Sequence, residues 1–144
     1  MKACKKWIVS LLTFSLLVCS LCAAASATVL PDSLRVTSST TVPLSGDTQK
    51  IFAFPVSKDY GCWKIAIRNT ASADLSFDIR AGSPDGEVVY SSSYVPANSS
   101  LAFYSDDPLE DGTYYVTVRS AKGDINLNGT LWYKQGVSYD DIAN

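Results

Sequence analysis

Four carboxylates crowd into one short stretch of the sequence, "SDDPLEDG" (residues 105–112). The acids fall within six positions, as Asp106, Asp107, Glu110 and Asp111. Carboxylates this close repel one another unless they are well solvated or share a cation, and calcium prefers oxygen ligands from flexible loops. Pro108 and Gly112 would bend such a loop. The spacing matches no strict calcium motif, so the run indicates either a calcium site or a solvated turn that protects a sheet edge.

The stretch that follows, "GTYYVTV", alternates like a strand, so its adjacent tyrosines must point in opposite directions. We expect Tyr114 to face inward and Tyr115 outward, with Arg119 on the outward side. In the later segment "INLNGTLWY", the outward candidates are Asn126, Asn128 and Trp132. If the two strands are neighbours, these five outward residues form one ligand-binding surface, on which aromatic rings stack on sugars and polar groups bind hydroxyls. The alternative is that they pair across strands and stiffen the sheet.

The chain contains no histidine, which excludes a Ser-His-Asp triad, a Cys-His dyad and a histidine-built zinc site. A glycosidase needs two carboxyl groups across a cleft. Glu87 and Glu110 are the only glutamates. The aspartates cluster in turn sequences, where such residues usually cap backbone N–H groups or are solvated surface charges. We therefore expect no enzyme, with a small hydrolase that uses only carboxylates as the alternative.

The elements that would position these residues are short strands. Apolar residues recur with a period of two between turn clusters, most clearly in residues 50–56, 63–67, 74–79, 101–103, 114–118 and 125–133. No segment after residue 27 has helical periodicity, so no crossover helix is available for a parallel sheet. The pattern predicts an antiparallel jelly-roll-type β-sandwich of seven or eight strands, with Trp63 in the core. The segment around Pro43 would add an edge strand.

The first 27 residues have the features of a secretory signal peptide. Three lysines precede an apolar run, and Ala25 and Ala27 occupy the positions of a cleavage site. An uncleaved anchor and a lipoprotein attached through Cys19 or Cys22 are the alternatives. The expected organisation is a signal peptide (1–27), a β-sandwich domain (28–134) and a weakly ordered C-terminal tail (135–144), with the product secreted, extracellular or periplasmic.

Signal removal changes both the charge and the cysteine count of the chain. The remaining residues hold 9 of the 12 Lys and Arg and all 14 acids, so the net charge becomes 9 − 14 = −5. Such a chain has no basic footprint for nucleic acid or anionic membranes, and we expect no stable membrane insertion after cleavage. Cys62 is the only remaining cysteine, and we interpret it as a small buried apolar residue. A reactive thiol or a bridge to another chain is the alternative.

Several segments together resemble a known family. They are "LSGDTQKIFAFPV", "ADLSFDI", "SPDGEVVYSS", and "DGTYYVTVRS" followed by "INLNGTLWY". From about Val42 to Lys134 the chain resembles the bacterial pre-peptidase C-terminal domain, a jelly-roll sandwich appended to secreted enzymes. The resemblance implies binding or folding assistance rather than catalysis. It also implies calcium and an extracellular polymer as ligands of some members, including collagen-binding domains of collagenases.

These observations favour a secreted, non-catalytic binding module for an extracellular polysaccharide or matrix protein, with calcium as the candidate cofactor. A purely structural or inhibitory secreted protein is the alternative that the sequence does not separate from it. A flat outer face would favour polymer binding, and a deep cleft holding two carboxyl groups would favour a hydrolase.

The first prediction concerns processing. Exported protein should begin at Thr28 and carry Cys62 as its only thiol, because the other cysteines leave with the signal peptide. Intact-mass spectrometry of secreted material, with and without thiol labelling, measures both. A mass that retains residues 1–27, or a lipid adduct, would contradict the prediction.

Overall fold

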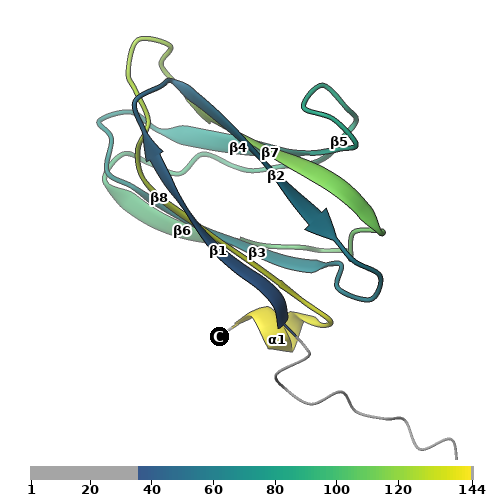
Figure 1. Cartoon of the computed structure of the whole chain (residues 1–144). Helices are drawn as coiled ribbons and strands as arrows, with labels where there is room; N and C mark the ends of the chain where they lie inside the picture. Colours follow the sequence, from purple (N-terminus) through teal and green to yellow (C-terminus); the bar gives the residue numbers. More distant parts are fainter. Residues whose placement is uncertain (1–35, 144) are drawn as a thin grey trace, which may run out of the picture.

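The computed structural model describes residues 36–143, with the side chains given from residue 39 onward, and the expected signal peptide lies outside this range. The described chain forms eight strands and one short helix (Figure 1). They are β1 (Val36–Ser45), β2 (Gln49–Val56), β3 (Cys62–Asn69), β4 (Leu75–Ala81), β5 (Val88–Ser91), β6 (Ser99–Tyr104), β7 (Gly112–Ser120), β8 (Asn128–Gly136) and α1 (Tyr139–Ala143). No helix within residues 36–143 is long and apolar enough to cross a membrane.

The strands form two four-stranded antiparallel sheets that pack face to face (Figure 1). Sheet A has the order β1-β8-β3-β6, and sheet B has the order β2-β7-β4-β5. Four strand pairs correspond to one long hairpin that folds over on itself, namely β1–β8, β2–β7, β3–β6 and β4–β5. Two further pairs, β3–β8 and β4–β7, complete the two sheets. This nesting is a jelly roll, and it confirms the predicted fold class.

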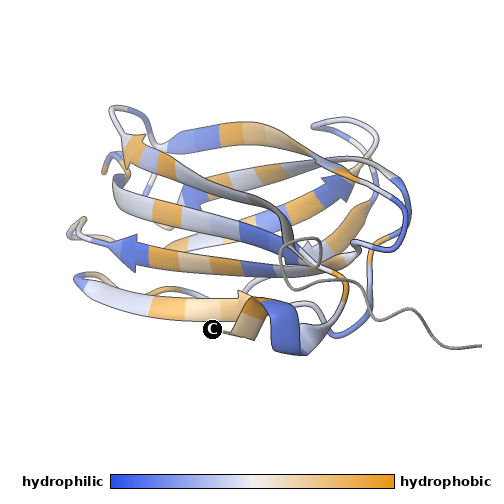
Figure 2. Cartoon of the chain, turned by 60° about the horizontal axis from the view of Figure 1, so that its bottom comes forward, coloured by the Kyte–Doolittle hydropathy of each residue, from blue (hydrophilic) through white to orange (hydrophobic). Residues whose placement is uncertain are grey.

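The core lies between the sheets and is rich in aromatic rings. Apolar and polar residues alternate along most strands, so that one side of each strand faces inward (Figure 2). Trp63 is only 2% exposed, which confirms its expected place in the core. Its ring meets Tyr90 of sheet B edge-on at 4.8 Å, and Phe77 of sheet B meets Phe103 of sheet A edge-on at 5.1 Å. These contacts join the two sheets through geometry that aromatic pairs prefer.

The segment around Pro43 forms an edge strand, as predicted. β1 pairs only with β8 and lies at the edge of sheet A, with Pro43 opposite Thr130. Pro55 lies in β2, the corresponding edge of sheet B. A proline cannot donate to a strand ladder, so both lie where a sheet tolerates them.

The C-terminal residues are folded, which corrects the predicted weakly ordered tail beginning at 135. Gln135 and Gly136 still belong to β8, and α1 follows, with Ile142 fully buried. The carboxylate of Asp141 accepts hydrogen bonds from the backbone N–H and the hydroxyl of Ser138, at 2.9 and 2.7 Å. This Ser-x-x-Asp spacing is a signal for the start of a helix. The helix has only five residues, so a search for helical periodicity over longer segments does not detect it.

Cys62 fills the role expected from the sequence. Its thiol is buried and lies 3.6 Å from the carbonyl oxygen of Val137, to which it donates a weak hydrogen bond. Burial raises the pKa of this thiol above its ordinary value, and the nearby charge of Asp141 adds to the rise. The side chain therefore behaves as a small packed group that helps to hold the β8–α1 connection against β3.

The two tryptophans of the described chain give a matched pair for testing the core. Trp63→Ala should reduce the free energy of unfolding by about 3–5 kcal/mol, the usual range for removing a buried large aromatic ring. Trp132→Ala removes the same atoms from a side chain that is 43% exposed, so its cost should be well under half as large. Denaturant unfolding of both variants measures the difference, and equal losses would show that the inward and outward sides of β3 or β8 are assigned wrongly.

Candidate functional site

The proposed binding residues divide between the two sheets, so they do not form one surface. Tyr115 and Arg119 belong to β7 in sheet B, whereas Asn128 and Trp132 belong to β8 in sheet A. The inward and outward assignments hold, because Tyr114 is buried and Tyr115 is half-buried on the opposite side. The two strands are not neighbours, so the condition for a single shared surface is not met. Tyr115 and Trp132 therefore lie on opposite outer faces of the sandwich.

The outer face of sheet A presents Trp132 among small neighbours. Thr41 of β1 and Ala66 of β3 register directly opposite Trp132, and Ala102 of β6 lies beyond Ala66 in the same row. None of these residues is tall enough to cover an indole. The ring is 43% exposed as a result, and it stands on a regular sheet surface rather than in a cleft.

Asn126 and Asn128 lead from this face into a shallow depression at one end of the sandwich. The depression is open, with a volume of about 520 Å³, and lies between the β1–β2 turn, the β3–β4 loop and the start of β8. Its lining residues are Ser45, Gly46, Thr70, Ala71, Ser72, Ile125, Asn126, Leu127 and Asn128. None of them carries a carboxyl group. The lining instead offers amides, hydroxyls and backbone groups, which hydrogen-bond neutral polar ligands.

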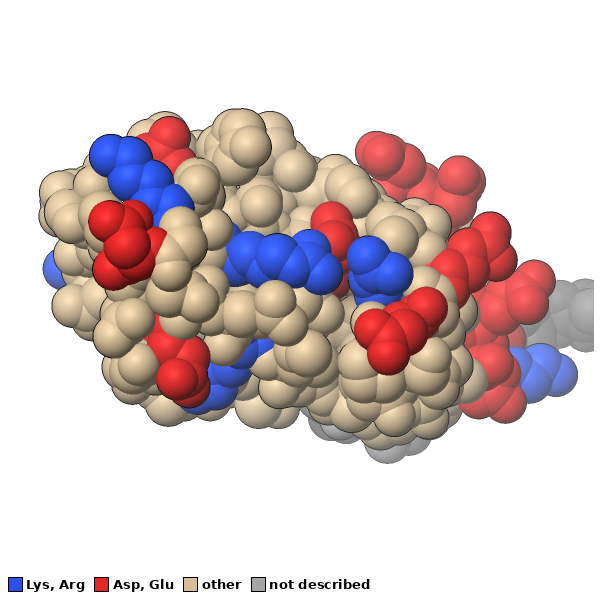
Figure 3. Space-filling model, turned by 90° about the horizontal axis from the view of Figure 1, so that it is seen from above, with Lys and Arg blue, Asp and Glu red and all other residues tan. Residues whose placement is uncertain are grey.

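The outer face of sheet B holds a charged network centred on Asp78. Arg119 donates a hydrogen bond to the Asp78 carboxylate, Ser91 donates another at 3.0 Å, and Arg80 lies 3.7 Å away. Figure 3 looks onto this side and shows basic atoms flanking an acidic group in the middle of a largely uncharged face. Burial alone would raise the pKa of Asp78, but the hydrogen bonds from Arg119 and Ser91 and the two positive charges lower it below its ordinary value.

In this network the charged side chains on the outer face of sheet B pair with one another. The Arg119 guanidinium, which the sequence suggested as a ligand donor, is already paired with Asp78. Beneath the network, the hydroxyl oxygen of Thr117 and Nε of Arg80 are buried without a hydrogen-bond partner among the described residues. The sequence analysis missed the network. The signal was present, since Asp78, Arg80 and Arg119 all occupy outward positions of their strands.

The acidic run forms an exposed loop that is held in place by hydrogen bonds to its backbone groups. All four carboxylate residues are exposed, and no three acidic or cysteine side chains within residues 36–143 are grouped to hold a metal ion. The backbone N–H of Leu109 donates to the Gly61 carbonyl at 2.9 Å, and the Tyr114 hydroxyl donates to the Glu110 carbonyl at 3.1 Å. A Cβ on Gly61 would lie 2.2 Å from the Leu109 carbonyl oxygen, so this close approach requires glycine.

Comparisons with known proteins found similarity in structure only. No family model matches the chain, and no curated protein matches it. A solved structure described as "Bacillus endospore appendages form a novel family of disulfide-linked pili" is similar at 10% identity, covering 71% of this chain and 88% of that one, with a TM-score of 0.49. The pre-peptidase C-terminal domain of a collagenase from Bacillus anthracis is similar at 18% identity, covering 68% and 87%, with a TM-score of 0.43.

A third similar structure is PirA, at 16% identity, covering 67% of this chain and 92% of that one, with a TM-score of 0.41. The family that the sequence resembles is thus represented among the similar structures. At these identities the likeness concerns the fold, and the residues of the two outer faces must be judged on their own chemistry.

The calcium hypothesis for Asp106, Asp107, Glu110 and Asp111 leads to a direct test. Because these side chains are solvated and not gathered around a common point, we expect the melting temperature to be the same in calcium and in a chelator. A calcium site would instead add about 2.7 kcal/mol at a hundredfold excess over the dissociation constant. A calcium-dependent rise that vanishes in Asp106→Asn/Asp107→Asn, and that magnesium does not reproduce, would establish the site.

Proposed function

We propose that this protein is a non-catalytic, secreted module that binds an extracellular glycan on the outer face of sheet A. The observation that carries the proposal is the exposed indole of Trp132, which stands between Thr41 and Ala66 on a regular sheet. An indole exposed to this extent offers a flat apolar surface. A sugar ring has a similar flat face of C–H groups, so the two can stack.

Hydrogen-bonding groups lie along the same strand. Asn128 and Thr130 alternate with inward residues and share the outward side of β8 with Trp132. Asn128 and Asn126 also line the depression beyond the strand. Amide groups both donate and accept, as sugar hydroxyls do. A polymer that stacks on Trp132 and runs along β8 would therefore meet amides at its next units.

The chemistry of the depression supports a binding role rather than hydrolysis. Glycosidases act with two carboxyl groups on either side of the bond that they cleave, and the nine lining residues include no acid. The acids of the 106–111 loop are exposed and belong to a different loop of the fold. The signal-like N-terminal sequence supports secretion, and the single buried thiol suits a domain that is stable by packing.

Retention on polysaccharides tests the proposal. Secreted protein should bind at least one member of a panel of cellulose, chitin, starch and acidic polysaccharides. Trp132→Ala should weaken that binding by about tenfold, corresponding to about 1.4 kcal/mol of lost stacking, with little change in melting temperature. Tyr115→Ala is the matched control, since it removes an outward aromatic ring from the other sheet, and it should bind normally.

Three results would contradict the proposal. They are no retention on any polysaccharide, retention that Trp132→Ala leaves unchanged, and retention on a matrix protein such as collagen instead. The last result would keep the protein a polymer-binding module but replace the glycan with a protein ligand.

A further inference from the structure

The outer face of sheet A carries an excess of positive charge, although the whole chain has a formal net charge of −2. Its three charged side chains are Lys64 and Arg68 on β3 and Lys134 on β8, all at outward positions. No acidic residue occupies any other outward position of this face. This holds for β3, β6, β8 and residues 39–45 of β1. This face is therefore a local positive region on an acidic protein.

The charges lie on both sides of Trp132. Arg68 registers opposite Thr130, one outward row before Trp132, and Lys64 registers opposite Lys134, one outward row after it. The Arg68 side chain is exposed and makes no hydrogen bond or ion pair within the described range. An anionic group on a chain stacked over the indole would thus have a cation within reach in either direction along β8.

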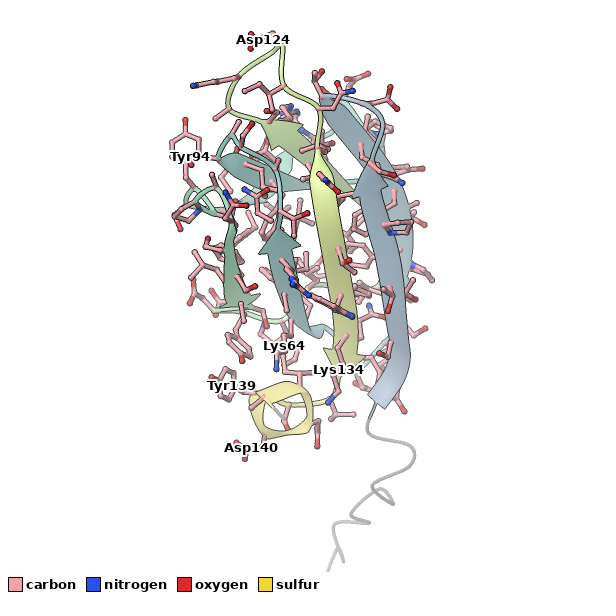
Figure 4. All side chains as sticks on the ribbon, turned by 90° about the vertical axis from the view of Figure 1, so that its left-hand side faces the viewer. Lys64, Tyr94, Asp124, Lys134, Tyr139 and Asp140 are labelled. Carbon is pink, nitrogen blue, oxygen red and sulfur yellow. The ribbon has the colours of Figure 1, made fainter. Side chains whose placement is uncertain are left out.

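Two carboxylates, those of Asp140 and Asp141, border this face because α1 packs against β3 and β8. Asp141 accepts both hydrogen bonds from Ser138. Figure 4 looks onto sheet A and places Lys64 and Lys134 beside α1, with Asp140 on the side of the helix away from the strands.

A second aromatic site extends the same face. Tyr104 of β6 registers opposite Lys64, whose ammonium group lies 5.3 Å from the centre of the tyrosine ring. Tyr104 also packs on Tyr139 of α1, with ring centres 5.1 Å apart. Two strand spacings and two residues separate Tyr104 from Trp132, which corresponds to about 12 Å between their backbones. This is longer than one sugar ring, so a ligand touching both must be an oligomer.

We propose that the glycan bound by this face is an anionic polysaccharide, one that carries carboxylate or sulfate groups along its chain. The inference rests on the proposed function and names the ligand class for the same site. Trp132 and Tyr104 supply the stacking surfaces, and Arg68 neutralises a charge of the ligand on one side of the indole. Lys64, whose ammonium group also donates a hydrogen bond to the carbonyl of Ala143 at 2.9 Å, and Lys134 add positive charge on the other side. Charge complementarity selects this class over neutral glycans, because a neutral chain gains nothing from three cations on one face.

The overall charge of the chain separates this ligand from nucleic acid. A single nucleic-acid strand carries one charge per ~3.4 Å, and its binding depends on an extended basic surface. Here the positive region is confined to one face of an acidic chain, which repels a densely charged polymer at longer range. An acidic polysaccharide spaces its charges more widely and can place one at each cation.

Matched probes test the ligand class in the presence of a chelator. Polygalacturonate and a lightly sulfated dextran, with less than one sulfate per sugar, are the charged probes, and fully methyl-esterified polygalacturonate and dextran are their neutral counterparts. We expect secreted protein to bind at least one charged probe at least about tenfold more tightly than its neutral counterpart, with affinity falling as salt is added. Arg68→Gln should weaken binding about tenfold, the effect of losing one charge-assisted hydrogen bond.

Lys58→Gln is the matched control, since it removes one exposed positive charge from the β2–β3 turn. It should bind within about twofold of the unchanged protein. Equal binding of charged and neutral probes, with Trp132 still required, would overturn the ligand class and leave the proposed function standing. Absence of binding to all polysaccharides would overturn both. Tighter binding of single-stranded DNA than of either charged probe would replace the polysaccharide by nucleic acid.

Discussion

The rest of the structure depends on the packing of aromatic rings between the two sheets. Trp63 of sheet A meets Tyr90 of sheet B, and Phe77 of sheet B meets both Tyr90 and Phe103. Cys62 is the only cysteine in the described residues, so no disulfide fastens one described strand to another. The outer faces keep their geometry because the inner faces interlock, and an exposed indole on β8 is held in place by the buried Leu131 and Tyr133 on either side of it.

Local pattern determined which way each side chain points. The period of two placed Tyr114 inward, Tyr115 outward and Trp132 outward before any strand was paired, and the structure agrees at each position. The same pattern carries no information about which strands are neighbours. β8 pairs with β1 and β3, and β7 pairs with β2 and β4, so two strands adjacent in sequence lie in different sheets. That is why the sequence left open whether Tyr115 and Trp132 share a face, which the strand pairing excludes.

The two outer faces show how similar residue types serve different purposes. On sheet B, Arg119 and Arg80 surround Asp78, and their charges are compensated within the protein. On sheet A, Arg68 stands in a row with Pro43, Thr130 and Ser100, and no carboxylate registers beside it. The amino-acid composition does not show whether an arginine is paired with a carboxylate or exposed to solvent. Only the strand register distinguishes a cation used for cohesion from one presented to solvent.

The nested strand pairing also bears on how the chain reaches its folded form. β4 and β5 are close in sequence, so their pairing closes a short loop, whereas β1 and β8 join the two ends of the domain. Such distant contacts make folding slow. β8 also occupies the interior of sheet A, between β1 and β3, so until the last strand is in place β1 has no strand partner and β3 pairs only with β6. Sheet A, which presents the exposed indole of Trp132, is therefore completed only when the last strand of the domain joins it.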